Sequence, residues 1–225
     1  MKHTDTDNRQ VAFFGRMTAS ITHEMKNVLA IIKESSGLMQ DILAFSREET
    51  CPYEDKLKDV LHTIGEQITR GVELTSRLNR FAHDPDENIR KTDLTDQVEH
   101  LVALSQRFAR LQNVVLKVDP PKRPILIETC PVQLQMALFT GIECCLHLME
   151  TGGQIYLSPQ KQGGKALIRI ICEGDDPDET AFGELLFKYE KWPALRKQVE
   201  ILGGSVEPDP STRGISISLP EKIPV

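Results

Sequence analysis

Apolar residues recur at three- and four-residue steps along the first third of the chain. Residues 8–49 contain no proline, and their apolar stripe comprises Phe14, Met17, Ile21, Met25, Val28, Ile32, Met39 and Ile42. This spacing predicts one long amphipathic helix of about 60 Å, at about 1.5 Å per residue. After the break CPYED, a second helix ending before Asp84-Pro85 is predicted by Leu57, Leu61, Ile64, Ile68, Val72, Leu78 and Phe81.

Two such helices predict an antiparallel hairpin. A lone hairpin cannot enclose a core, so its apolar stripe requires a partner. The simplest partner is a second copy of the chain, which gives a dimeric four-helix bundle. We therefore expect a homodimer.

A change of pattern follows the hairpin. The segment HDPDENIRKTD is polar and contains a proline, which predicts a hinge between a hairpin domain, residues 1–84, and a second domain, residues 85–225. In the second domain the pattern predicts a helix over 93–111 and strands at VVLKVD and PILIE. It then predicts a buried helix at CPVQLQMALFTGIECCLHLM that stops at Gly152-Gly153.

The rest of the second domain repeats this alternation. Strands are predicted at QIYLS and ALIRIIC, helices over 182–189 and 193–202, and closing strands at SVEP and GISISLP. This order predicts a mixed sheet with helices on one face, a two-layer α/β sandwich. The fold class of the whole chain is therefore α+β.

Composition narrows the function. The 225 residues carry 27 basic and 33 acidic side chains, a net charge of -6, which argues against nucleic acid as a primary partner. No apolar run approaches the roughly 20 residues that span a bilayer, and the start MKHTDTDNRQ lacks the apolar segment of a secretion signal. A cytoplasmic protein without membrane insertion is expected. The five cysteines show no C-x-x-C pair and are interpreted as reduced.

Polar chemistry is concentrated in SITHEMKNVLAII, residues 20–32. A helix advances about 100° per residue, so His23 lies about 200° from both Ile21 and Met25 and faces away from the apolar stripe. A surface histidine beside Glu and Lys is common and by itself does not indicate catalysis. A zinc-protease helix would need a histidine at position 27, where the chain has Asn27.

The segment resembles the H-box of two-component histidine kinases, in which the phosphorylated histidine is followed by an acidic residue and then Asn or Thr. His23, Glu24 and Asn27 fall on these positions. The segment ITRGVELTSRLNRFAH resembles the partner helix of that family. CPVQLQMAL, GGQIYLS, LGGSVE and GISISLP resemble the scaffold of its ATP-binding domain.

The chain departs from the family at several places. Val28 replaces the proline that often follows the Asn or Thr, so the helix should continue without a kink. Thr140 and Cys144 replace the two asparagines of the nucleotide-binding helix, and a thiol is a poor Mg²⁺ ligand. The segment CEGDDPDE, with Glu173 and Gly174 as the nearest match, replaces the adenine-reading aspartate. The second glycine-rich loop is absent from residues 178–193.

This combination resembles histidine phosphotransferases built on a degenerate kinase scaffold, which pass a phosphoryl group between response regulator receivers. The resemblance implies that His23 carries the phosphoryl group, that ATP binding is lost and that Mg²⁺ comes from the receiver, so the chain holds no cofactor or metal of its own. Two alternatives stay open. One is a non-catalytic pseudokinase scaffold that regulates a kinase or response regulator, and the other is a divergent ATP-dependent histidine kinase.

Roles for the neighbours of His23 follow from helical spacing. Glu24 is expected to orient the ring and accept its proton, and Asn27, one turn later, to hydrogen-bond a phosphoryl oxygen or the incoming carboxylate. Counting back from the turn places Arg77 and Arg80 level with His23, where one of them is expected to steady phosphoryl charge. The surface that a receiver approaches is predicted at Ser20, Lys26, Ala30, Lys33, Arg77 and Arg80.

Overall fold

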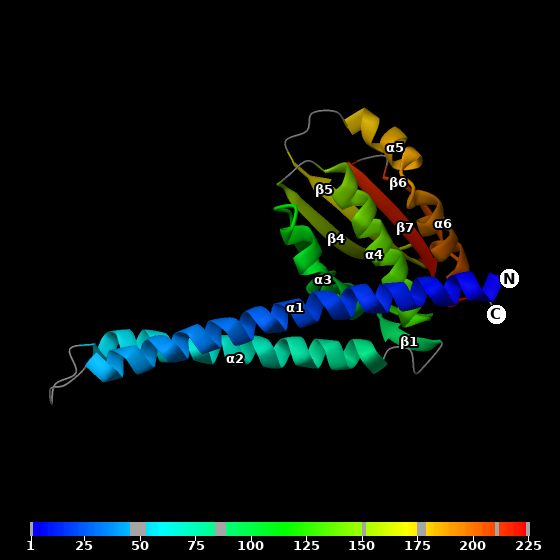
Figure 1. Cartoon of the computed structure of the whole chain (residues 1–225). Coiled ribbons are helices and arrows are strands. Elements are labelled where there is room, and N and C mark those ends of the chain that lie inside the picture. Colours follow the sequence, from blue (N-terminus) through cyan, green and yellow to red (C-terminus); the bar gives the residue numbers. More distant parts are fainter. Residues whose placement is uncertain are drawn as a thin grey trace. The chain divides into compact units, whose positions relative to one another are not determined.

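The chain forms two compact units in the computed structural model, which describes residues 2–45, 53–83, 89–149, 152–174, 179–209 and 212–223 (Figure 1). One unit, residues 14–82, is called the hairpin. The other, residues 83–225 together with 1–13, is called the α/β unit. The domain boundary predicted between residues 84 and 85 lies outside the described residues.

The hairpin is formed by two long helices, α1 (Lys2–Phe45), from residue 14 onward, and α2 (Glu54–His83). The predicted proline-free apolar period accounts for both, although α1 begins before residue 8, and residues 46–49 lie outside the described part. The helices pack through their apolar stripes, with the rings of Phe14 and Phe81 4.6 Å apart. Gly71 of α2 faces Val28 of α1, because a Cβ at Gly71 would be in van der Waals contact, 3.4 Å from Val28 Cγ1.

The first turns of α1 belong with the α/β unit. Phe13 is 5% exposed, and its ring centroid lies 5.7 Å from that of Phe139. Phe13, which the sequence placed in the hairpin domain, therefore contributes to the core of the α/β unit.

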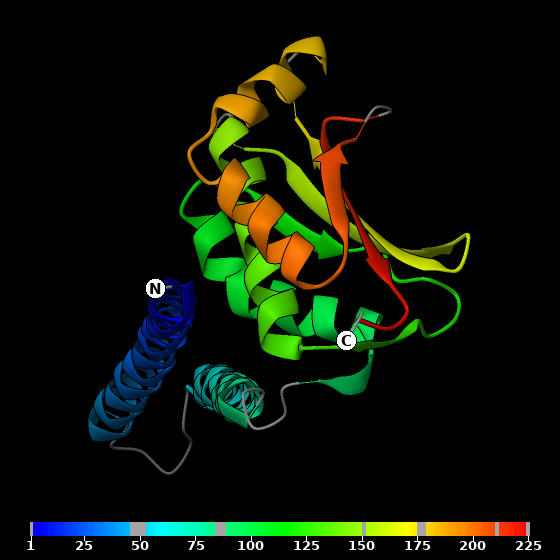
Figure 2. The ribbon, with the colours of Figure 1, turned by 90° about the vertical axis from the view of Figure 1, so that its right-hand side faces the viewer.

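The α/β unit is a two-layer sandwich, with a five-stranded sheet covered on one face by helices (Figures 1 and 2). Its helices are α3 (Leu94–Arg110), α4 (Pro131–Leu148), α5 (Glu179–Lys188) and α6 (Trp192–Ile201). The strands of the large sheet, in the order β2-β4-β5-β7-β6, are β2 (Val115–Val118), β4 (Gln154–Gln162), β5 (Lys165–Glu173), β7 (Gly214–Pro220) and β6 (Ser205–Pro208). Only β2 and β4 run parallel, and the other neighbours are antiparallel.

The core lies between this sheet and helix α4. Alternate residues of β5 and β7 are fully buried, and Ile168 and Ile170 pair with Ile217 and Ile215. Gly141 allows α4 to pack closely against β5, because a Cβ at this position would lie 2.6 Å from Ile170 Cδ1. The two-residue turn between β4 and β5 uses Gly163 and Gly164, both with positive φ, which favours glycine.

The polar segment after the hairpin contains a strand that the sequence analysis missed. Strand β1 (Arg90–Asp93) pairs antiparallel with β3 (Leu126–Thr129) in a separate two-stranded sheet. The hinge prediction is therefore wrong over residues 90–93, and PILIE does not join the main sheet. Asp93 then begins α3, because its carboxylate accepts hydrogen bonds from the backbone N–H groups of Thr95 and Ile125. Strand β1 was not predicted because its four residues, RKTD, are all polar and show no alternation of apolar and polar residues.

None of the described helices is both long and apolar enough to cross a bilayer.

Candidate functional site

His23 lies on the solvent-exposed face of α1. The apolar residues Ile21 and Val28, which flank its turn, are each 3% exposed. The 3.6-residue period that buries these side chains directs the imidazole outward. The nucleophilic ring is thus available to a second molecule.

Asn27 is the residue that approaches the imidazole. Its Nδ2 atom lies 3.5 Å from His23 Nδ1, at the outer limit of a hydrogen bond. An asparagine amide presents an NH₂ donor or, turned over, a carbonyl acceptor, so it is able to hold either tautomer of the ring. The sequence assigned ring orientation to Glu24 and a phosphoryl contact to Asn27, whereas the structure brings Asn27 to the ring.

Glu24 makes an ion pair across the hairpin. Its Oε2 atom lies 3.4 Å from Nη2 of Arg70 on α2, and its side chain is only 12% exposed. Arg70 was not among the predicted site residues. Arg70 is 46 residues from Glu24 in the sequence, and the way the two helices align brings them together. Helical spacing within one segment cannot predict such a partner.

The two arginines that the sequence did predict are partly exposed on α2. Arg77 Nη2 lies 3.8 Å from Glu73 Oε2 of its own helix, a distance at which an exposed ion pair contributes little. Of the other predicted partner positions, Lys26, Ala30 and Lys33 are exposed, whereas Ser20 is buried, at 2% exposure. The structure therefore does not present Ser20 on the surface where the sequence analysis placed it.

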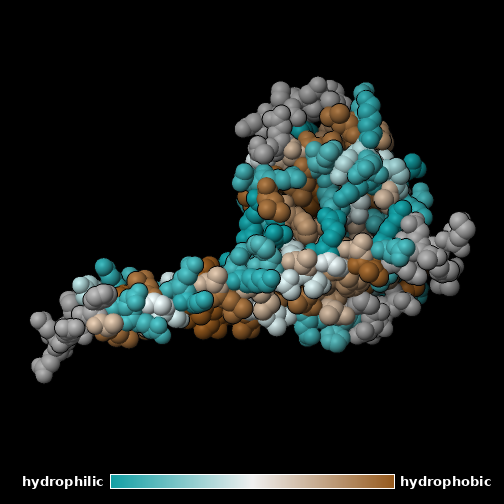
Figure 3. All heavy atoms as spheres, in the orientation of Figure 1, coloured by the Kyte–Doolittle hydropathy of each residue, from teal (hydrophilic) through white to brown (hydrophobic). Residues whose placement is uncertain are grey.

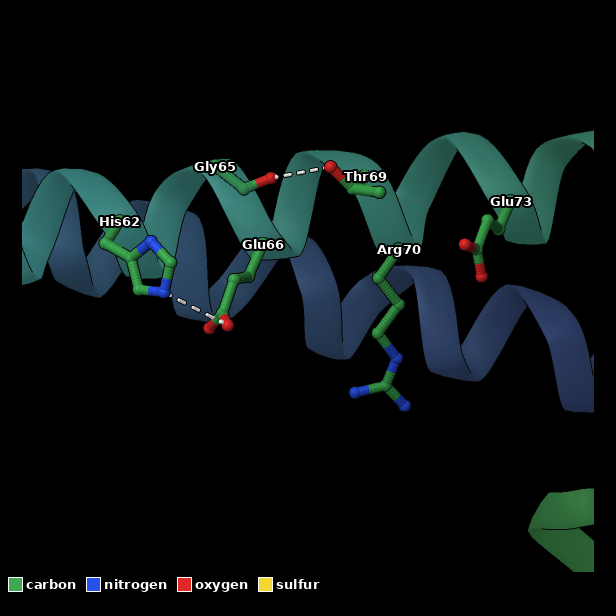
Figure 4. Close-up of a pocket in the computed structure, with 6 residues that line it drawn as sticks. All are labelled: His62, Gly65, Glu66, Thr69, Arg70 and Glu73. Carbon is green, nitrogen blue, oxygen red and sulfur yellow. Dashed lines mark hydrogen bonds and ion pairs between the residues drawn. The ribbon is translucent and has the colours of Figure 1, made fainter.

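An open polar groove of about 530 Å³ runs along α2 beside Arg70. It is lined by His62, Gly65, Glu66, Thr69, Arg70 and Glu73 (Figure 4). His62 and Glu66 form an exposed ion pair within α2, with Nε2 and Oε1 3.3 Å apart. In this view none of the marked interactions joins Arg70 to Glu66 or Glu73.

A second, apolar groove of about 560 Å³ lies between α1 and α2 within the hairpin. Three of its lining side chains are large, apolar and more than half exposed: Leu29 at 61%, Ile68 at 53% and Val72 at 61%. Figure 3 shows apolar side chains gathered along the middle of the hairpin. Exposed apolar patches are a common feature of protein interaction sites.

Helix α4 carries Thr140 and Cys144, which replace the two asparagines of the nucleotide-binding helix in the resembled family. The Thr140 hydroxyl donates a hydrogen bond to the Met136 carbonyl at 2.9 Å, and Thr140 is 8% exposed. Cys144 is fully buried, and this burial, followed by the nearby Glu143 carboxylate, raises the pKa of its thiol to about 12. A buried thiol is a poor ligand for a hard cation that prefers oxygen.

Two further contacts hold the turn between α5 and α6 against α4. Lys191 Nζ donates to Glu143 Oε1 at 2.8 Å, with Glu143 only 12% exposed. The rings of His147 and Tyr189 stack with centroids 4.0 Å apart and an interplanar angle of 12°. Side chains from the turn after α5 therefore cover this part of α4. Residues 175–178, part of the segment CEGDDPDE, lie outside the described residues.

The chain was compared with known protein families and solved structures. No protein-family model matches the chain. The catalytic domain of histidine kinase ThkA superposes with a TM-score of 0.52 at 14% identity, over 61% of this chain and all of that domain. Over this share of the chain, the fold resembles that of a histidine kinase catalytic domain. The predicted fold class, with its sandwich resembling the histidine kinase ATP-binding domain, is confirmed.

Two curated proteins show sequence similarity. The chain is 28% identical to sensor protein FixL of Bradyrhizobium diazoefficiens over 142 residues, 62% of this chain and 27% of that protein. It is 24% identical to alginate biosynthesis sensor protein KinB of Pseudomonas aeruginosa over 159 residues, 68% of this chain and 26% of that protein. The chain thus spans about a quarter of the length of the curated relatives it matches.

Proposed function

We propose that this chain is a histidine-containing phosphotransfer protein of a two-component phosphorelay, in which His23 carries a phosphoryl group between receiver aspartates. The observation that carries the proposal is the exposed His23 imidazole on a helical hairpin, with Asn27 at its ring nitrogen, in a chain that also has a histidine kinase catalytic fold. Similarity to two sensor proteins supports the signalling context.

The proposed step needs only groups on the hairpin and on the partner. The lone pair of one imidazole nitrogen attacks phosphorus, and the P–O bond to the receiver aspartate breaks, so that the electron pair leaves with the aspartate carboxylate. The proton on the other ring nitrogen becomes more acidic and passes to a base. Asn27 holds the ring, and Glu24 on the same turn is the proposed proton acceptor. Mg²⁺ would come with the receiver.

The proposal includes the loss of ATP-dependent autophosphorylation. It is supported by the hydroxyl of Thr140, which is bonded to backbone, and by the buried thiol of Cys144, at the positions where the resembled kinases carry asparagines. The Lys191–Glu143 and His147–Tyr189 contacts on the same helix give further support. A bound nucleotide would have to displace them or lie elsewhere.

A divergent ATP-dependent histidine kinase is the second candidate. The observation in its favour is the match to the whole length of a kinase catalytic domain, which leaves the layout of a nucleotide-binding fold in place. In this alternative His23 keeps its role, and only the phosphoryl donor changes. A third alternative is a non-catalytic scaffold, in which His23 carries nothing.

We also propose that the chain is a homodimer. The apolar groove between α1 and α2 supports this assembly, because Leu29, Ile68 and Val72 would remain in water in a single hairpin. Two copies that bury these grooves against each other form a four-helix bundle and leave each His23 on the outside.

Purified protein incubated with labelled ATP and Mg²⁺ distinguishes the first two candidates. Acid-labile, base-stable phosphohistidine at residue 23 would overturn the phosphotransferase in favour of the kinase. Without that signal, receivers loaded with acetyl phosphate become the donors, and labelled His23 supports the phosphotransferase. A His23→Gln variant that retains cellular function although wild-type His23 is never labelled would favour the scaffold.

A further inference from the structure

The Glu24–Arg70 ion pair joins the two helices at the turn that carries His23. The side chain of Arg70 extends away from α2 and beyond those of Glu66 and Glu73 (Figure 4). Its Nη2 atom lies 3.4 Å from Glu24 Oε2. The guanidinium is 42% exposed, whereas the carboxylate is 12% exposed. Nη2 makes this contact, and a guanidinium carries five N–H donors, so that further N–H groups of the partly exposed Arg70 can meet an anion from solvent.

We infer that Arg70 binds the phosphoryl group on its way to His23 and that this contact draws Arg70 away from Glu24. The inference rests on the proposed function. A phosphoryl group carries more negative charge than a carboxylate and offers three acceptor oxygens, so a guanidinium prefers it. Glu24 is then released at the moment when the attacking imidazole becomes acidic.

The exchange assigns a separate task to each polar group of the site. Asn27 holds His23, Arg70 receives the phosphoryl oxygens, and Glu24 changes from the partner of Arg70 to the proton acceptor. The N–P bond to His23 forms while the bond from phosphorus to the donor breaks, and no further reactant is needed. In the resting protein the pairing of Arg70 with Glu24 keeps both charges partly compensated.

The prediction from the sequence named Arg77 and Arg80 for the phosphoryl contact, and the geometry favours Arg70. Arg77 is directed to Glu73 of its own helix, whereas Arg70 reaches the residue adjacent to His23 on the other helix. Arg70 also borders the open polar groove of α2, so its guanidinium is reachable from solvent.

Potassium phosphoramidate tests the inference without an identified receiver. It transfers its phosphoryl group to imidazole, and its nitrogen takes up a proton and leaves as ammonia. One P–N bond therefore breaks as another forms. His62, whose side chain is 77% exposed on the same hairpin, provides an internal reference for an imidazole outside the site. Mass spectrometry under basic conditions gives the rate at each histidine over a range of phosphoramidate concentrations.

The two partners are expected to shift the apparent KM for phosphoramidate in opposite directions. Arg70→Gln should raise it about tenfold, the loss of one charge-assisted hydrogen bond, and Arg70→Lys should restore part of the effect. Glu24→Gln should lower the KM, because its guanidinium partner is freed, and should also lower the maximal rate, because the proton acceptor is lost. Lys58→Gln, which removes a cation paired with Glu54 on the same helix, is the matched control and should change neither value.

The outcomes separate the inference from the proposed function. If wild-type His23 reacts no faster than His62, the proposed phosphotransfer site is wrong. If His23 reacts faster but Arg70→Gln leaves its KM unchanged, or if Arg77→Gln raises the KM instead, only the role of Arg70 is wrong. A purely structural ion pair would make both Arg70→Gln and Glu24→Gln raise the KM and lower the melting temperature. Circular dichroism of each variant verifies that the helices are intact.

Discussion

Val72→Glu should dissociate the proposed dimer without unfolding the chain. Val72 is 61% exposed in the apolar groove of the hairpin, and full burial of such a side chain contributes about 1.5–3 kcal/mol. The exposed part therefore accounts for about 1–2 kcal/mol in each copy, and for about 2–4 kcal/mol in a symmetric dimer. At about 1.4 kcal/mol per factor of ten, the dissociation constant should rise at least about 30-fold.

Sedimentation equilibrium over a concentration series measures this constant directly. Leu111→Glu is the matched control, since Leu111 is 68% exposed at the end of α3 and lies outside the groove. Urea unfolding of both variants in the monomeric range should stay within about 0.5 kcal/mol of the wild type, because each new carboxylate remains in water. A wild-type chain that is monomeric at about 100 µM, a concentration at which even weak specific dimers form, or a Val72→Glu dimer of unchanged affinity, would refute the reasoning.

Three further predictions concern the core and the ring of the histidine. Gly204→Ala should lower the free energy of unfolding by about 1–3 kcal/mol in urea titrations, because the added methyl group would meet a backbone carbonyl of β7. Gly37→Ala, at an open position in a helix, should raise it by about 0.5–1 kcal/mol. An unfolding energy that rises in Gly204→Ala would contradict this packing. Burial raises the pKa of the Cys144 thiol from 9.0 to about 12, so between these pH values the thiol keeps its proton in the folded state and loses it in the unfolded state. The free energy of unfolding should therefore fall by about 1.4 kcal/mol per pH unit in this range. Cys144→Ala should flatten this slope, and an equally steep slope in the variant would rule Cys144 out as its cause. Asn27→Ala should shift the ¹⁵N resonances of the His23 ring toward the tautomer mixture of a free imidazole, and unchanged resonances would exclude the contact.

Elements whose form depends on one periodicity were predictable from the sequence. Apolar steps of three and four residues predicted both hairpin helices, and the outward face of His23 followed from its angle to Ile21 and Met25. Alternation in ALIRIIC and GISISLP predicted β5 and β7, whose alternate side chains are buried. Each of these features depends only on residues that are close in the chain.

Tertiary structure decided everything that requires two distant segments to meet. The pairing of Arg70 with Glu24 depends on the hairpin register, which the count from the turn could not define to within one side chain. The polar strand β1 exists because β3 supplies its hydrogen bonds, and nothing in the pattern RKTD indicates this partner. The helical pattern looks the same on both sides of Phe13, and the contact of Phe13 with the ring of Phe139 could not be read from it. Local spacing determines which face of an element is apolar, but the identity of the group opposite it is set by the fold.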